Sequence, residues 1–192
     1  MKLIFIFLCN IIFSNTLSNW IDSNKHIINS QSYKILFDQK IESVIGGATH
    51  SILDTNTSVI IFANSIRYNS SDRTIILNQD SLKIINKRNN QLFIDEVQNS
   101  YDSFLEVDLI KILARGELQS YEGNDFYYIK FNDFIDLKIY LENQEIITIE
   151  ILNNNISTKL SNIHFLAIDS IEANNYFIID NSSFSIFDLR DK

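Results

Sequence analysis

A period-two alternation of apolar and polar residues runs through much of this chain and limits what it can fold into. Residues 33–45 alternate apolar side chains with Lys, Asp and Glu, and the same alternation returns in residues 135–141 and 147–151. Successive side chains of a β-strand point to opposite faces, so this pattern places one face against a core and the other against water. The chain is therefore predicted to be mainly β.

Further segments have the composition of strands and are separated by short turns rich in Asn, Asp, Ser and Gly, such as Gly46-Gly47. Connections this short join antiparallel neighbours in a meander. No strand alternates with a helical pattern, which argues against a doubly wound α/β fold. These segments are residues 58–63, 66–69, 73–77, 82–85, 91–97, 126–131, 156–168, 176–179 and 184–189.

Two segments have a helical pattern instead. Residues 20–30 form a short amphipathic stretch, and residues 103–114 carry apolar side chains on one helical face. Ser103 and Glu106 fit a capping box at the start of the second helix, and Gly116 follows its end. We expect one curved, largely antiparallel sheet whose apolar face is covered by one or two helices.

The first residues have the order of an export signal. Lys2 gives a positive start, residues 3–13 are almost entirely apolar, and small or polar residues follow up to Ser18. The apolar run is about half of the roughly 20 residues that a membrane-spanning helix needs. We therefore expect a signal peptide at residues 1–18 and one domain at residues 19–192. Cys9 follows Leu8 rather than a small residue and is assigned to the discarded signal, with acylation of Cys9 as the alternative.

Charge and cysteine content exclude several classes of protein. The formal net charge is −8 and no basic cluster is present, which argues against binding to nucleic acid or to anionic lipid surfaces. Cys9 is the one cysteine of the sequence, so burial of apolar surface rather than disulfide bonds must stabilise the domain.

No catalytic or metal-binding constellation is recognisable. His26, His50 and His164 lie far apart, none has a partner at metal-ligand spacing, and no serine lies in a G-x-S-x-G motif. We predict no enzyme activity, no cofactor and no metal. A sheet with an apolar concave face under a helix has room for a hydrophobic ligand. The alternative is that the same apolar residues pack on one another.

The order of segments in the middle of the chain resembles a known family. Residues 75–77 match an apolar strand, residues 80–86 a turn and a strand, and residues 90–95 an N-Q-V strand. The helix at 103–114 and the strands at 134–140 and 145–151 follow in the same order. This order resembles the periplasmic outer-membrane lipoprotein carriers, the LolA-type proteins, over about residues 33–190.

Two motifs of that family are missing. Ser81 and Ile84 stand about where the family has the glycine and tryptophan of D-G-K-x-L-W, and nothing near Ala63-Asn64 matches its Lys-Arg-Pro. The arginine of that family motif helps to hold a lid closed, so the missing motif bears on how the lid is held more than on the fold.

The resemblance implies an incomplete, half β-barrel with one to three helices as a lid over an apolar hollow. It implies a monomeric periplasmic carrier that shuttles lipoprotein acyl chains from the inner to the outer membrane. Its partners would be an inner-membrane lipoprotein-releasing transporter and an outer-membrane acceptor. The predicted lining residues are Tyr33, Ile35, Phe37, Ile41, Ile60, Phe62, Ile76, Ile84 and Phe93 from the strands, and Leu105, Leu109, Ile112 and Leu113 from the helix.

Rival interpretations share much of this pattern. A periplasmic lipid-binding or regulatory module on the same half-barrel is one, and a secreted structural β-protein with a filled core is another. A ligand in an apolar cavity distinguishes the carrier and the lipid-binding module from the structural protein.

Overall fold

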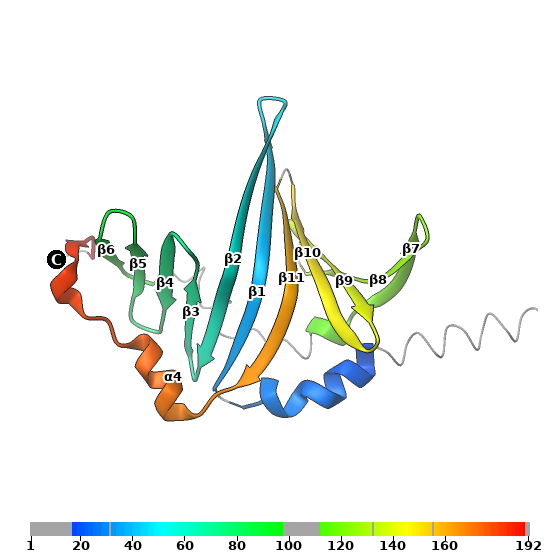
Figure 1. The fold of residues 1–192 in the computed structure, drawn as a ribbon, viewed down its shortest axis with the longest axis horizontal. Helices are drawn as coiled ribbons and strands as arrows, with labels where there is room; N and C mark the ends of the chain where they lie inside the picture. Colours follow the sequence, from blue (N-terminus) through cyan, green and yellow to red (C-terminus); the bar gives the residue numbers. More distant parts are fainter. Residues whose placement is uncertain (1–16, 31, 98–111, 132, 155, 191–192) are drawn as a thin grey trace, which may run out of the picture. The chain divides into compact units, whose positions relative to one another are not determined.

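The computed structural model describes residues 17–30, 32–97, 112–131, 133–154 and 156–190. Its strands belong to one sheet in the order β12-β6-β5-β4-β3-β2-β1-β11-β10-β9-β8-β7 (Figure 1). The bounds are β1 Ser32–Ile45, β2 Ala48–Phe62, β3 Ser65–Asn69, β4 Arg73–Leu77, β5 Leu82–Asn86, β6 Gln91–Asp95, β7 Glu117–Tyr121, β8 Asn124–Lys130, β9 Ile135–Glu142, β10 Glu145–Asn153, β11 Ile156–Ala167, α4 Ser170–Phe177, η1 Asn181–Ser183 and β12 Ser185–Asp188.

The predicted fold class, mainly β with one open and largely antiparallel sheet plus helices, is confirmed. In the part of the sheet whose strand register is described, every pairing is antiparallel except that of β12 with β6, which is parallel. The predicted turn at Gly46-Gly47 joins β1 and β2, and both glycines have the positive φ that a tight hairpin turn requires.

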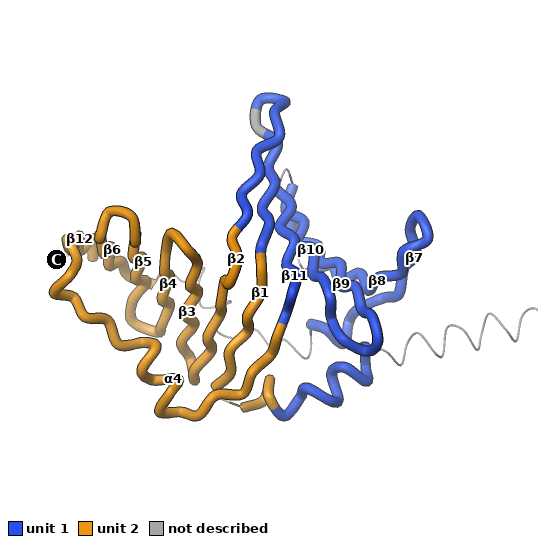
Figure 2. The backbone as a smooth tube through the Cα atoms, in the orientation of Figure 1, with its two compact units in different colours: residues 1–26, 39–53, 108–163 blue, residues 27–38, 54–107, 164–192 orange. Residues whose placement is uncertain are grey.

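The chain divides into two compact units, which Figure 2 shows in different colours. Unit 1 comprises residues 1–26, 39–53 and 108–163, and unit 2 comprises residues 27–38, 54–107 and 164–192. Strands β1, β2 and β11 each contribute residues to both units. Each unit has its own buried apolar residues, and each is described separately below.

A row of apolar side chains crosses the sheet of unit 1. Strand partners that lie directly opposite share a face of the sheet. The register from β7 to β11 places five apolar residues in this way, and Ile139 at its centre has no exposed surface. The row consists of Leu118, Tyr127, Ile139, Ile149 and Leu160.

The predicted N-terminal helix is present and occupies residues 17–28. Leu17 and Trp20 are 3% and 2% exposed, and Ile21 is half-buried, so the buried positions follow the i, i+3, i+4 spacing of an amphipathic helix. Of the predicted helix at residues 103–114, only the end lies within the described residues, where Ile112 and Leu113 are helical.

Unit 2 has a second buried face. Ile60 and Ile76 are both opposite Arg67 in the register, so they share its face, and they are 1% and 2% exposed. Ile85 and Leu92 are partners on β5 and β6 and are also buried. These residues form the apolar core of this part of the sheet.

Helix α4 replaces a predicted strand at residues 176–179. Asp169 caps the helix by accepting a hydrogen bond from the Glu172 amide at 2.7 Å, which favours a helical start. The guanidinium of Arg67 donates to the carbonyl oxygen of Tyr176 at the helix end. The Phe62 and Phe177 rings lie 6.2 Å apart. These contacts bind α4 to strands β2 and β3, which is why the apolar residues near 176 are helical.

Candidate functional site

An apolar cavity of about 260 Å³ lies in unit 1 between the N-terminal helix and the β7–β8 hairpin. The helix contributes one wall, the chain around residues 113–116 a second, and the two strands a third. Most of the side chains are aliphatic or aromatic and none is charged. The lining residues are Leu17, Ser18, Ile21, Leu113, Ala114, Gly116, Leu118 and Tyr127.

Gly116 allows the walls of this cavity to approach each other. A Cβ at this position would lie 2.9 Å from Leu17 Cδ2, 3.2 Å from the Leu113 carbonyl oxygen and 3.3 Å from Tyr127 Cβ. Because Gly116 has no side chain, the N-terminal helix at Leu17, the chain around Leu113 and strand β8 at Tyr127 can all pack closely around it. Gly116 was predicted only as a helix end, and the structure gives it this packing role as well.

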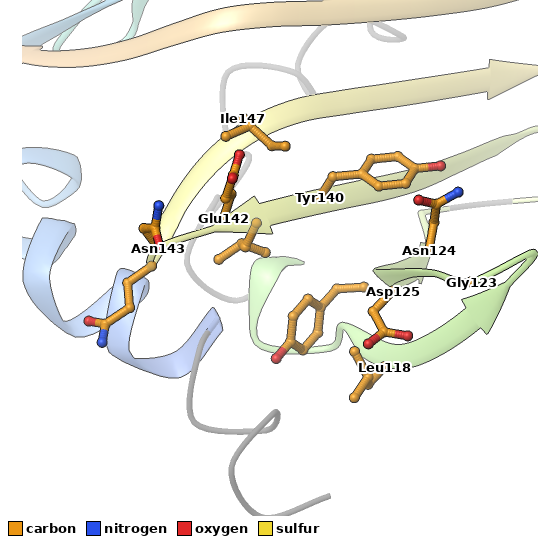
Figure 3. A pocket seen from close by; sticks show the side chains of 11 residues that line it. Leu118, Gly123, Asn124, Asp125, Tyr140, Glu142, Asn143 and Ile147 are labelled. Atoms are coloured by element: carbon orange, nitrogen blue, oxygen red, sulfur yellow. The ribbon is translucent and has the colours of Figure 1, made fainter. Parts of the chain in front are cut away.

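A second, larger cavity of about 520 Å³ lies beside the first and is shown in Figure 3. The β7–β8 hairpin contributes Asn124 and Asp125, and the β9–β10 hairpin contributes Glu142 and Asn143 on another side (Figure 3). Its full lining is Leu118, Gly123, Asn124, Asp125, Tyr127, Tyr140, Leu141, Glu142, Asn143, Gln144 and Ile147. Leu118 and Tyr127 line both cavities, so the two spaces share a wall.

The larger cavity has a mixed polar and apolar lining, and its charged side chains are acidic. Asp125 and Glu142 are exposed carboxylates, and no lysine or arginine is among the lining residues. Asp125 accepts a hydrogen bond from the Ser120 hydroxyl. The Tyr140 hydroxyl donates to Glu150 at 3.2 Å, and burial together with the negative charge of Glu150 raises the pKa of Tyr140. The site therefore combines an apolar cavity with an adjoining cavity that carries negative charge.

Among the predicted lining residues, Leu113 lines the apolar cavity and is 3% exposed. Its neighbour Ile112 is half-buried, whereas Leu105 and Leu109 lie outside the described residues. Of the predicted strand residues in unit 2, four are buried, namely Tyr33, Phe37, Ile60 and Ile76. Half-buried are Ile35, Phe62, Ile84 and Phe93 of unit 2 and Ile41 of unit 1.

The strand register separates two pairs of these predicted residues. Ile84 and Phe93 are partners on β5 and β6, and Ile84 is also opposite Ile75 on β4. Ile75 and Ile76 are consecutive, so their side chains point to opposite faces. Ile84 and Phe93 therefore face away from Ile60 and Ile76, and the expectation that both pairs line one hollow is corrected: Ile85 and Leu92 share the face of Ile76.

Sequence reasoning missed most of the cavity wall. Leu17 and Ser18 were assigned to the signal peptide, and β7, which carries Leu118, has too little alternation to be recognised. The sequence offers one signal, Gly123 between the polar residues Glu122 and Asn124. In the structure, Glu122 and Gly123 both have positive φ and join strands paired from Tyr121 and Asn124, which is the geometry of a two-residue hairpin turn.

Two other features bear on the kind of site. Within the described residues, no three His, Cys, Asp or Glu side chains lie close enough together to hold a metal ion. In the same part of the chain, no helix has the length and apolar character needed to span a membrane.

No protein-family model matches the sequence, and comparison with curated proteins gives no significant match. Among solved structures, the chain is similar to an uncharacterized conserved protein from Thermus thermophilus, with a TM-score of 0.47, 14% identity and coverage of 88% of this chain and 99% of that one.

The chain is also similar to two further solved structures. One is a putative outer membrane lipoprotein-sorting protein domain from Vibrio parahaemolyticus, with a TM-score of 0.37, 8% identity and coverage of 82% and 96% of the two chains. The other is a LolA superfamily protein from Nitrosomonas europaea, with a TM-score of 0.34, 9% identity and coverage of 79% and 93%.

Proposed function

We propose that this protein binds an acyl chain in the apolar cavity of unit 1 and carries it, as part of a lipid or lipoprotein, between membranes. The observation that carries the proposal is the cavity of about 260 Å³ between the N-terminal helix and the β7–β8 hairpin, whose lining has no charged side chain. A carrier needs such a space, and it needs no catalytic group.

The size of the cavity indicates how much of a ligand it takes. Sites for drug-sized ligands measure about 300–1,000 Å³, so this cavity accommodates one chain rather than several. Each buried methylene contributes about 0.8 kcal/mol, and five of them contribute about 4 kcal/mol. A contribution of this size corresponds to a dissociation constant of about 1 mM, so such a chain is readily released to an acceptor, and burial of further methylenes holds it more tightly.

In this proposal the N-terminal helix acts as a lid for the acyl chain. It covers the cavity through Leu17 and Ile21, and the narrow contact at Gly116 joins it to β8. A lid held by a few side-chain contacts opens at a low cost in free energy, because local opening requires only these contacts to be lost.

Export and partners belong to the same proposal. We place the protein in the periplasm as a monomer, with an inner-membrane transporter as donor and an outer-membrane acceptor as recipient. Because Leu17 and Ser18 line the cavity, the signal must be removed ahead of Leu17 for the mature chain to keep this wall. Intact-mass measurement of the exported protein tests this, and a mature chain that begins at Asn19 contradicts it.

The binding experiment is a calorimetric titration of the purified protein with monododecanoyl glycerol below its critical micelle concentration. We expect saturable binding of one molecule. Leu113→Asp places a carboxylate in the apolar wall and should abolish binding. Leu189→Asp makes the same change at a side chain that is 58% exposed, and it should bind like the unaltered protein.

A second variant separates loss of binding from loss of folding. Leu118→Trp adds volume at the half-buried wall between the two cavities without adding charge. Reduced binding in a variant with unchanged circular dichroism supports the site. Undiminished binding to both Leu113→Asp and Leu118→Trp means that the chain binds elsewhere, and the proposal fails.

A further inference from the structure

The two cavities of unit 1 differ in chemistry although they share a wall. The smaller one has no charged lining residue, whereas the larger one has two carboxylates and several side-chain amides. We propose that the larger cavity is a head-group site that accepts uncharged or cationic heads with hydrogen-bond donors and rejects anionic ones. This inference rests on the proposed binding of an acyl chain next to it.

The two cavities adjoin. Leu118 and Tyr127 are directly opposite each other on β7 and β8, and both line both cavities. On this inference, an acyl chain in the smaller cavity places its polar end toward the larger one. The larger cavity, at about 520 Å³, has room for a glyceryl or amine-bearing head.

The charges of the larger cavity have one sign. Asp125 and Glu142 come from the ends of two different hairpins, and the lining contains no lysine or arginine. An anionic head, such as a phosphate, would find carboxylates on two sides of the cavity and no lysine or arginine in its lining. Repulsion of this kind is stronger near a protein surface than in bulk water, because the effective dielectric constant is lower there.

The hydrogen-bonding groups point to the same class of ligand. An ionised carboxylate only accepts hydrogen bonds, so Asp125 and Glu142 require donors from the head group when water is displaced. Asn124, Asn143 and Gln144 add further acceptors, and their amide NH₂ groups can donate to hydroxyl oxygens. Hydroxyl and ammonium heads supply donors, whereas a fully ionised phosphate supplies none.

The experiment compares three probes with the same twelve-carbon chain and different heads: monododecanoyl glycerol, dodecylammonium and dodecyl phosphate. Binding of each to the unaltered protein is measured by calorimetry below its critical micelle concentration. We expect the first two to bind at least about tenfold more tightly than the phosphate, which corresponds to about 1.4 kcal/mol. Screening by salt should reduce this preference between about 0.05 and 0.5 M ionic strength.

Variants assign the preference to the two carboxylates. The double variant Asp125→Asn with Glu142→Gln should bring the three affinities to within about twofold, mainly by tighter binding of dodecyl phosphate. Asp133→Asn is the control for net charge, because Asp133 is 89% exposed, pairs with Lys130 and lies outside the cavity lining. It should leave the preference unchanged.

The outcomes separate this inference from the proposed function. If none of the probes binds, the acyl-chain site itself is wrong. If all three bind with equal affinity to the unaltered protein, the acyl-chain site stands and the head-group site is refuted. If Asp133→Asn weakens the preference as much as the double variant does, the acidic field of the whole chain rather than this cavity is responsible, and the inference is likewise refuted.

Discussion

The close contact at Gly116 gives a prediction whose magnitude follows from the structure. Gly116 does not have a positive φ, so alanine fits the backbone there. Its Cβ would nevertheless lie 2.9 Å from Leu17 Cδ2 and 3.2 Å from the Leu113 carbonyl oxygen. Overpacking of this kind costs about 1–3 kcal/mol. The reduced freedom of the unfolded chain offsets about 0.4–1 kcal/mol.

We therefore expect Gly116→Ala to lower the free energy of unfolding by about 1.3 kcal/mol, which is the difference between the midpoints of these two ranges. For a chain of this length, each kcal/mol lowers the melting temperature by roughly 2–4 °C. The assay is urea unfolding followed by circular dichroism. Hydrogen exchange should be faster in residues 17–28, since Leu17 must move away from the new methyl group.

A double-mutant cycle tests the reason for the effect. Leu17→Ala removes the side-chain atom nearest to the new Cβ, so Gly116→Ala should cost less in that background. We expect a coupling of at least about 0.5 kcal/mol, the lower end for residues in contact. Equal costs of Gly116→Ala with and without Leu17 would show that the two walls do not touch, and the lid account would be wrong.

Three further changes test other parts of the structure. Thr57 is fully buried and its hydroxyl has no hydrogen-bond partner among the described residues, so Thr57→Val should stabilise the protein by about 1 kcal/mol in urea unfolding. Thr74→Val is the contrasting change: the Thr74 hydroxyl donates to Asn69 Oδ1 at 2.8 Å, so its loss should destabilise the protein by about 1 kcal/mol. Burial raises the pKa of Tyr33 from 10.0 to about 12. Stability linked to Tyr33 is therefore complete below pH 10 and is lost as the pH rises toward 12, so Tyr33→Phe should lose less stability than the unaltered protein between about pH 10 and 12; an equal loss contradicts the assignment. Arg67→Met removes the donor to the Tyr176 carbonyl and should speed hydrogen exchange in α4, and unchanged exchange there would show that this contact does not hold the helix.

The sheet could be predicted from the sequence wherever one face is apolar and the other polar. Residues 33–45 alternate clearly, and β1 covers Ser32–Ile45. Alternation fails where both faces carry apolar residues. Ile84 and Ile85 are consecutive, and only the register with β4 and β6 decides that Ile85 is the buried one. A single sequence indicates where a strand lies, but it does not show which residues of the neighbouring strands lie opposite.

Other elements depend on contacts that the local sequence does not contain. The first half of β2, residues 48–57, lacks a strand pattern and is extended because the Gly46-Gly47 turn leads it back along β1. Residues 176–179 have the composition of a strand, yet the Asp169 cap and the contact with Arg67 favour a helix through Phe177. In both cases tertiary contacts override local propensity.

The candidate site was predictable in kind more than in position. An apolar space under a helix followed from the pattern, and Leu113 belongs to it. Its other walls come from Leu17, Leu118 and Tyr127, which three separate segments bring together. The acidic cavity was not predictable, because Asp125 and Glu142 lie on different hairpins and nothing in the sequence distinguishes them from the other carboxylates.

Native mass spectrometry of the protein purified from the periplasm of an outer-membrane bacterium, with lipid extraction of the same sample, tests the central claim most directly. We predict a bound acyl species on the unaltered protein and on Leu189→Asp, and its loss from Leu113→Asp. A ligand-free mass that stays unchanged when acyl lipids are offered would contradict the account and favour a structural protein with a filled core.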